Sequence, residues 1–246
     1  MNRNQNIQIL ITLNQAYLPR LQVMLTSMHS SQPDEKFDIW LLHNSIPEES
    51  LEPVTCQCRA LGYAFHPVTV DSAAFTGAPV SRQYPREMYY RLLAPFLLPR
   101  RLHRILYLDP DILVINQLRL GTDHAYFNSG VLLIDLDQGR NEIIAGDIFN
   151  YTREHARELL LPDQDILNAM YGYRTLPVDD SIWNYDARNY NTYLLRSGGV
   201  CDMDWVMKCT SVLHFCGKSK PWQKGYIHRF GILYKHYGQL TQRMME

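Results

Sequence analysis

The chain of 246 residues contains no apolar run that approaches the roughly 20 residues a membrane-spanning helix needs. Its first apolar run, Ile7–Ile11, is also too short for the core of a secretory signal peptide. An excess of one charge is absent too, since 24 basic side chains oppose 25 acidic ones. Nucleic-acid-binding domains usually carry a basic surplus, so the balance excludes that class of partner. We therefore expect a cytoplasmic globular protein, and its 46% of hydrophobic residues suffice for a sizeable core.

Cysteine is scarce, and its spacing excludes a disulfide framework. The five cysteines are odd in number and show no paired spacing of the kind that zinc sites use. We expect free, mostly buried thiols in a reducing compartment. These residues are Cys56, Cys58, Cys201, Cys209 and Cys216.

The first seventy residues alternate between short apolar runs and amphipathic segments. Leu18, Leu21, Leu25 and Met28 fall at helical spacing, whereas the apolar runs on either side are short and buried in character. The order β-α-β-α-β is typical of a parallel sheet covered by helices. The expected strands are Ile7–Leu13, Phe37–His43 and Tyr63–Val70, and the expected helices are Tyr17–Ser30 and Pro47–Leu61.

The remaining chain continues the α/β pattern, and we expect a mixed, mainly parallel sheet flanked by helices. The signal is weak from Tyr171 to Ser211, where we expect turns, aromatic residues and short strands. A terminal amphipathic helix carries Phe230 and Leu240 and is expected to pack on the domain, with weak peripheral membrane attachment as the alternative. Further expected helices are Pro85–Leu98, Arg140–Leu160 and Asp163–Met170, and further strands are Arg104–Leu108, Phe127–Leu136 as an interior strand, and Val212–Phe215.

Asp109-Pro110-Asp111 follows the predicted strand Arg104–Leu108 and spaces two carboxylates one residue apart. In an extended segment, side chains repeat every second position, so both carboxylates point the same way. Pro110 keeps Asp109 out of the helical region. Carboxylate oxygens suit Mg²⁺ or Mn²⁺, above all when diphosphate oxygens complete the coordination shell. The motif indicates a metal site at the carboxyl end of a strand, with a solvated turn or helix cap as the alternative.

The segment from His214 to Trp222 carries a second set of candidate ligands. His214 offers a nitrogen ligand, which would tilt the preference from Mg²⁺ toward Mn²⁺. Gly217 permits close approach of a phosphate to the backbone. Lys220 can neutralise the negative charge that develops on a leaving diphosphate. A buried histidine followed by a solvated basic turn is the alternative.

Polar side chains also gather between Pro162 and Asn168. Asp163 is expected to be the N-cap of a helix, and Asp165 falls in the first turn, where an acidic residue is favoured. Helix capping explains much of this segment. The functional alternative places Asp163, Gln164 and Asp165 beside the hydroxyls and the anomeric carbon of a sugar.

Together, four segments resemble the retaining glycosyltransferases of family 8, the class that contains bacterial lipopolysaccharide galactosyl- and glucosyltransferases and the glycogenins. They occur in the family's order and span most of the chain: Leu106–Asp111, Phe127–Leu133, Asp163–Asn168 and His214–Trp222. The resemblance implies the nucleotide-diphospho-sugar transferase fold of the A type (GT-A, Rossmann-like). We expect one domain with a nucleotide-binding half, 1–115, a sugar and acceptor half, 116–225, and a C-terminal helix, 226–246.

The resemblance also implies a substrate pair and a cofactor. The donor is a UDP-hexose, glucose or galactose, and the acceptor a glycan or a lipid-linked saccharide of the lipopolysaccharide type. The metal is Mn²⁺, with Mg²⁺ as the alternative. Asp109, Asp111 and His214 are implied to hold the metal, with Pro110 between the acids, and Gly217 and Lys220 to hold the diphosphate. The donor sugar is implied to contact Arg91, Asn128, Asp163 and Gln164. The base is implied to contact Thr12, Asn14 and Tyr17.

The sequence departs from the family in two places. The family's acid at the uracil site aligns with Asn14, and its asparagine aligns with Ala16, which offers only backbone groups. The gap from Asp111 to Phe127 is also short, because the family carries a longer stretch there with a strand and a loop over the active site. Either the stretch is deleted, which would open the acceptor side, or the sequence omits a segment.

The implied reaction is hexosyl transfer with retention at the anomeric carbon. The acceptor hydroxyl attacks from the face that the diphosphate leaves, and the leaving phosphate takes its proton. Gln164 lies near the opposite face, and double displacement through Asp165 is the second choice, since Asp165 serves equally well to buttress the site. The competing functions are a non-catalytic nucleotide-sugar binding module, a metal-dependent nucleotide-sugar hydrolase and an α/β interaction domain without a metal.

Overall fold

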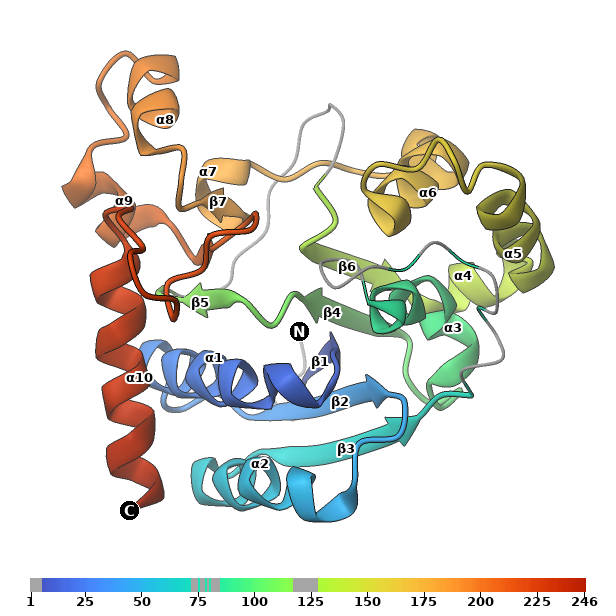
Figure 1. Ribbon diagram of the computed structural model, residues 1–246, viewed down its shortest axis with the longest axis horizontal. Helices are drawn as coiled ribbons and strands as arrows, with labels where there is room; N and C mark the ends of the chain where they lie inside the picture. The colour runs from blue at the N-terminus through green and yellow to red at the C-terminus, as the bar shows by residue number, and fades with distance from the viewer. Residues whose placement is uncertain (1–5, 72–74, 76–77, 79, 81–84, 117–127) are drawn as a thin grey trace. The chain divides into compact units, whose positions relative to one another are not determined.

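The computed structural model describes residues 6–71, 75, 78, 80, 85–116 and 128–246 (Figure 1). The chain folds into two compact units, each assembled from several segments of the sequence. Unit 1 contains Met1–Leu18, Lys36–Leu108 and Ala125–Thr175, and unit 2 contains Pro19–Glu35, Asp109–His124 and Leu176–Glu246. The predicted division into the halves 1–115 and 116–225 stays a prediction.

Five strands form the sheet of unit 1, in the order β3-β2-β1-β4-β6. β1 pairs in parallel with β2 and β4, and β2 pairs in parallel with β3. β4 and β6 are antiparallel. The expected α/β class with a mixed, mainly parallel sheet is therefore confirmed. The strands are β1 (Ile7–Thr12), β2 (Phe37–His43), β3 (Ala64–Thr69), β4 (Arg104–Leu108) and β6 (Val131–Asp135).

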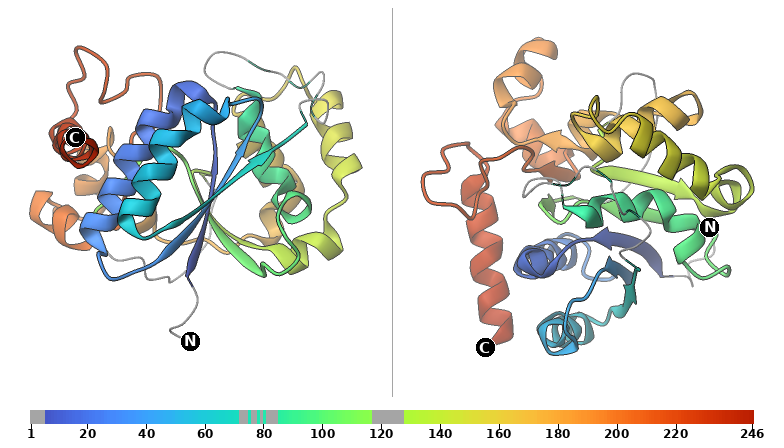
Figure 2. Two further views of the ribbon diagram at one scale, coloured as in Figure 1. Left: turned by 90° about the horizontal axis from the view of Figure 1, so that it is seen from below. Right: turned by 45° about the vertical axis from the view of Figure 1, so that its right-hand side comes forward.

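Helices cover both faces of this sheet. Figure 2 shows α2 on one face of β1–β3 and the segment η3–α3 on the other. α2 ends at Gly62, whose positive φ of 70° closes the helix in the left-handed region, where glycine meets no Cβ penalty. The helical elements of unit 1 are η1 (Gln15–Tyr17), α2 (Glu48–Leu61), η3 (Arg86–Leu93), α3 (Ala94–Leu97), α4 (Leu136–Glu142), α5 (Ala145–Glu154), α6 (Pro162–Tyr171) and η4 (Gly172–Arg174).

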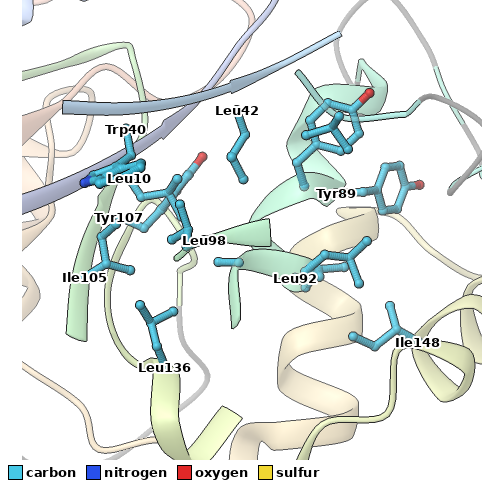
Figure 3. Close-up of a cluster of buried hydrophobic side chains, with 14 of the residues drawn as sticks. Leu10, Trp40, Leu42, Tyr89, Leu92, Leu98, Ile105, Tyr107, Leu136 and Ile148 are labelled. Atoms are coloured by element: carbon cyan, nitrogen blue, oxygen red, sulfur yellow. The ribbon is translucent and has the colours of Figure 1, made fainter. Parts of the chain in front are cut away.

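The core of unit 1 joins the sheet to η3, α3, α4 and α5 (Figure 3). Leu10, Trp40 and Tyr107 contribute from strands, and Tyr89 and Leu92 from η3. Burying one large apolar side chain stabilises a fold by roughly 1.5–3 kcal/mol, so this cluster fixes η3 firmly against the sheet. It thereby fixes the position of Arg91, the functional candidate that η3 carries.

Unit 2 is built on a smaller sheet with the strand order β5-β8-β7. Its core is rich in aromatic rings: Phe215 packs on Tyr234 with centroids 5.4 Å apart, and Tyr185 packs on Phe230 at 5.6 Å. Its strands are β5 (Ile112–Val114), β7 (Tyr185–Asp186) and β8 (Val212–His214), and its helices are α7 (Asp180–Trp183), α8 (Tyr190–Arg196), α9 (Met203–Cys209), α10 (Gly231–Met245) and α1 (Leu18–Ser31), of which Leu18 alone belongs to unit 1.

Two predicted helices are interrupted. Pro85–Leu98 is a 3₁₀ segment followed by the short helix α3, because Pro95 has no amide hydrogen to continue an α-helical ladder. Arg140–Leu160 is divided into α4 and α5 at Ile143 and Ile144. Both residues are extended, the conformation that β-branched side chains favour.

Two other expectations were wrong. β6 is no interior strand: within the described residues it is the last strand of its sheet, and Leu133 on it is 52% exposed. The region 171–211 is mainly helical, since it contains α7, α8 and α9, and its described strand is the two-residue β7. Asp179 and Asp202 cap α7 and α9 by accepting from the amides of Ser181 and Trp205, a signal that the sequence carried.

All five cysteines are free thiols, as expected. Cys58 and Cys201 are buried, Cys209 and Cys216 are half-buried, and Cys56 is exposed, so burial is less general than expected. None of the helices in the described part of the chain combines the length and the apolar character that crossing a bilayer requires.

Candidate functional site

The ladder between β5 and β8 brings Asp111 beside His214. The register pairs Ile112 with His214, and the Phe215 amide donates to the Asp111 carbonyl at 3.1 Å. On the other side, the Ala187 amide donates to the His214 carbonyl at 2.9 Å. Pro110 and Asp111 form a turn directly after Asp109, where we expected an extended segment, but the two carboxylates do converge. The convergence thus comes from the turn and the neighbouring ladder.

Asp109, Asp111 and His214 form a potential metal-binding cluster. Nε2 of His214 lies 3.6 Å from Oδ2 of Asp109 and 3.4 Å from Oδ1 of Asp111. One ligand atom from each residue lies within 4.8 Å of the other two. Neighbouring ligands of an octahedral ion with bonds of about 2.1 Å are about 3 Å apart, so small shifts suffice to bind one. Two carboxylates and an imidazole therefore fit a divalent cation such as Mn²⁺.

Asn184, which the sequence did not single out, orients the imidazole. Its Oδ1 lies 2.8 Å from Nδ1 of His214. An amide oxygen accepts, so Nδ1 carries the hydrogen and the Nε2 lone pair of the neutral ring faces the two carboxylates. Such outer contacts fix both the tautomer and the ring direction of metal-binding histidines. Asn184 is the C-cap of α7, directly before β7, and no motif marked it.

We expect Asn184→Ala to weaken Mn²⁺ binding by about 10- to 100-fold, the usual cost of removing such an outer contact. The fold should survive, because Asn184 is only half-buried at the end of α7. Titration of Mn²⁺ by electron paramagnetic resonance measures the change. Asn191→Ala, an exposed asparagine on α8, is the matched control and should bind Mn²⁺ like the wild type. An unchanged affinity in Asn184→Ala would remove Asn184 from this role.

The cluster is strongly charged. Burial alone would raise the pKa of Asp111, but His214 and Lys220 outweigh it and hold that pKa well below its ordinary value. Burial alone would lower the pKa of His214, but Cys216 and Asp111 outweigh it and hold that pKa well above its ordinary value. The ammonium of Lys220 pairs directly with the Asp111 carboxylate and also donates to the Phe215 carbonyl at 2.8 Å. Asp111 is therefore anionic and His214 readily protonated.

Metal affinity should consequently rise with pH. A divalent ion binds the neutral imidazole, so binding must release the proton that the raised pKa of His214 retains. Below that pKa, each unit of pH should change the apparent Mn²⁺ affinity by about tenfold, which is the effect of one released proton. Calorimetry from pH 6 to pH 8.5, in buffers of different ionisation enthalpy, measures both affinity and proton release. A pH-independent affinity would contradict the assignment of His214.

Unit 1 assembles a second group of predicted residues. Nη2 of Arg91 pairs with Oδ2 of Asp163 at 2.6 Å, with side-chain exposures of 6% and 4%. Nη1 of Arg91 donates to the Ser129 carbonyl at 2.6 Å, and the guanidinium lies over the Tyr107 ring, 4.3 Å from its centroid. We expected Asp163 to be the N-cap of α6, but Leu161 occupies that position. Its carboxylate is instead turned inward, because a buried guanidinium requires a counter-charge.

Gln164 belongs to the same group. Its Oε1 accepts from the Ser129 amide at 3.2 Å, and Oγ of Ser129 lies 3.5 Å from Oδ2 of Asp163. Asn128 adjoins the group in sequence, and its own Oδ1 accepts from the Gly130 amide at 2.9 Å. The contacts with Ser129 thus tie Arg91, Asp163 and Gln164 to one another.

Backbone amides bind the side-chain carboxylate of Asp165. Its Oδ2 accepts from the amides of Leu160 and Leu161 at 2.8 and 2.9 Å, at the point where α6 begins. Two such donors hold the carboxylate in place. The arrangement favours buttressing over nucleophilic attack.

The predicted base-binding residues follow β1. Thr12 is the last residue of that strand, and its hydroxyl lies 3.3 Å from that of Tyr107. Asn14 caps η1 through its side chain, which accepts from the Ala16 amide at 3.1 Å, and half-buried Tyr17 ends η1. Their contact with a base stays a prediction. The short stretch before Phe127 lies outside the described residues from Gln117 onward.

Comparison with known proteins agrees on one family. The model of the family described as Glycosyl transferase family 8 matches residues 8–120 and 115–225. General stress protein A of Bacillus subtilis (strain 168) is 23% identical, over 98% of this chain and 96% of that protein. The lipopolysaccharide 1,2-glucosyltransferase of Escherichia coli (strain K12) is 22% identical, over 96% of this chain and 78% of that protein. The first alignment runs over 278 positions, more than the 246 residues of this chain, so that relative has residues without a counterpart here.

Solved structures show the same fold. The galactosyltransferase LgtC, in complex with donor and acceptor sugar analogues, superposes with a TM-score of 0.79 at 21% identity. The superposition covers 95% of this chain and 96% of LgtC. The expected GT-A architecture is therefore confirmed.

Proposed function

Because this chain belongs to glycosyl transferase family 8, and is thus a hexosyltransferase, we propose that it moves glucose or galactose from a UDP-sugar to a glycan or a lipid-linked saccharide of the lipopolysaccharide type. We propose further that transfer requires Mn²⁺ and retains the anomeric configuration. The observation that carries the proposal is the convergence of Asp109, Asp111 and His214 within 4.8 Å. Mg²⁺, a harder ion, suits the carboxylates equally but the imidazole less well.

The metal cluster and the loop after β8 are proposed to act on the leaving group. Asp109, Asp111 and His214 hold the ion, which when bound supplies positive charge against the diphosphate oxygens. The Lys220 ammonium, now paired with Asp111, can turn to the same oxygens because its stem is flexible. Gly217 has a φ of 83°, a conformation that favours glycine, and its backbone amide is proposed to bind a phosphate oxygen. Each contact strengthens as negative charge builds on the departing UDP, so each lowers the barrier.

A separate set of polar residues is proposed to act on the donor sugar. Arg91, Asn128, Asp163 and Gln164 supply charged and amide groups that can exchange hydrogen bonds with hydroxyls. In the proposed reaction, the acceptor hydroxyl attacks from the face that UDP leaves and gives its proton to the leaving phosphate. Gln164 lies at the opposite face. Double displacement through Asp165 is disfavoured, because two backbone amides already hold its carboxylate.

The last two parts of the proposal are the residues that bind the uracil base and the cellular location of the protein. Thr12, Asn14 and Tyr17 hold the base, with Asn14 supplying an amide where the family carries an acid. A cytoplasmic location fits the five free thiols, which a reducing compartment preserves. Weak attachment to a membrane surface through the terminal helix α10 remains compatible with these roles.

Product analysis tests the proposal. The protein is incubated with a panel of UDP-sugars and Mn²⁺, with and without lipopolysaccharide-type acceptors, and the products are identified by mass spectrometry and their anomeric configuration by NMR. We expect a retained glycoside that forms only with both metal and acceptor. Free hexose and UDP despite an acceptor would indicate a hydrolase. Donor binding without turnover would indicate a binding module, and no change of the melting temperature by Mn²⁺ plus UDP would reject nucleotide-sugar chemistry altogether.

A further inference from the structure

Arg188 presents one edge of its guanidinium to the loop that follows β8. We propose that this edge is a further binding group for the diphosphate of the donor, beside Gly217. The inference rests on the proposed function, because it names an additional contact to the same leaving group. Neither the motifs of the sequence nor its family resemblance marked Arg188.

Asp186 anchors the guanidinium in a fixed direction. Nε of Arg188 donates to Oδ1 of Asp186 at 2.9 Å, and Nη2 donates to Oδ2 at 2.6 Å. The Arg188 amide also donates to Oδ1 at 3.0 Å. Such a two-pronged contact orients the planar group as well as binding it. Asp186 in turn is held by β7, whose register pairs it with His214 on β8.

The contacts with Asp186 involve Nε and Nη2 of Arg188 and leave Nη1 facing the loop that follows β8. Among the residues that the structure describes, no group accepts a hydrogen bond from Nη1 of Arg188. This nitrogen lies against Gly217: a Cβ placed on Gly217 would overlap Nη1 and would lie 3.2 Å from Cζ. The absence of a side chain at Gly217, together with its φ of 83°, therefore lets the guanidinium lie directly against the loop backbone.

The surroundings indicate an anion as the missing acceptor. Gly217 and Lys220 belong to the same loop, and His214 ends the strand that leads into it. Arg188 is 39% exposed on its side chain, so a ligand can reach it. Asp186 neutralises the formal charge of the pair, so Nη1 would contribute mainly as a fixed, charge-assisted donor. A phosphate oxygen is the acceptor whose geometry suits an oriented guanidinium.

The competing explanation is that Arg188 has a purely structural function, which is to hold the Asp186 carboxylate in place. The two explanations differ in their ligand dependence. A diphosphate contact affects ligands that carry the diphosphate and leaves the nucleoside alone, whereas a structural defect affects both. Lysine at this position is informative too, because one ammonium cannot hold Asp186 at two oxygens and still present a fixed donor beside Gly217.

Calorimetric binding of UDP and of uridine, each with Mn²⁺, tests the proposal on the full chain. Arg188→Gln and the double variant Arg188→Gln/Asp186→Asn should bind UDP about tenfold more weakly, the loss expected for one charge-assisted hydrogen bond. The double variant leaves no unpaired carboxylate and guards against a folding defect. Arg188→Lys should also be weakened. Uridine binding should stay within about twofold of wild type in every variant.

Arg196→Gln is the matched control. Arg196 is an exposed arginine of unit 2 that pairs with Asp180 at 2.6 Å, and its replacement should leave UDP affinity unchanged. If the wild type binds UDP tightly and both glutamine variants match it, the inference fails and the proposed function stands. An equal loss for UDP and uridine would also overturn the inference, by showing a structural role. If the wild type itself binds no UDP with Mn²⁺, the proposed function and the inference fall together.

Discussion

Asp109→Asn should abolish metal-dependent transfer, lowering kcat/KM by at least about a thousandfold. A bound ion contributes several kcal/mol to stabilising the leaving group, and about 4 kcal/mol corresponds to a thousandfold in rate. Asp109 is the better target of the two acids because its side chain is 21% exposed, whereas that of Asp111 is 11% exposed. Asp111, by contrast, pairs with Lys220, so its replacement would also leave that ammonium without its carboxylate.

Transfer rates measured across a range of Mn²⁺ concentrations check this result, and Mn²⁺ binding should weaken in parallel. Asp204→Asn provides the control, since Asp204 is an exposed acid in the first turn of α9 and should keep full activity. An Asp109 variant that transfers sugar at the normal rate, still strictly dependent on metal, would show that Asp109 is not a ligand.

Asp163→Leu should destabilise unit 1 by about 3–5 kcal/mol, because it strands the Arg91 guanidinium in the interior. For a chain of this length, that loss corresponds to a fall in melting temperature on the order of 10 °C. Arg91→Met should behave similarly, since it strands the Asp163 carboxylate. Calorimetric melting of the purified variants measures both effects, and transfer should be lost in each.

The double variant Arg91→Met/Asp163→Leu separates stability from function. Apolar replacement of a whole buried ion pair is often neutral, so a large part of the lost stability should return. Activity should not return, because the polar groups proposed to hold the donor sugar are still absent. A double variant less stable than either single one would show that the pair is not the source of the loss, and restored transfer would remove both residues from the sugar site.

The sequence predicted the elements with strong local patterns. Phe37–His43 was predicted to its exact bounds, and α2 was placed to within one residue, because these segments carry clear apolar periodicity and a proline at the helix start. The proximity of Asp111 and His214 was predicted only through the resemblance. Nothing local could predict it, since the β5–β8 pairing that creates it joins two three-residue strands far apart in the chain.

The missed residues have the same physical origin. Asn184 and Arg188 flank the two-residue strand β7, whose pairing with β8 gives both side chains their positions. A two-residue strand has no periodicity to detect. The inward turn of Asp163 was missed for another reason: a helix start explains an acid equally well, and only the buried Arg91 decides between the two.

The β5–β8 ladder also has a kinetic consequence. Contacts between distant parts of a chain form late, because the entropic cost of closing the loop comes before the stabilising energy of the contact. The pairing of Ile112 with His214 closes a loop of roughly a hundred residues, so the complete ligand set should exist only in molecules that have nearly finished folding. During refolding, bound manganese would then report a late stage of assembly.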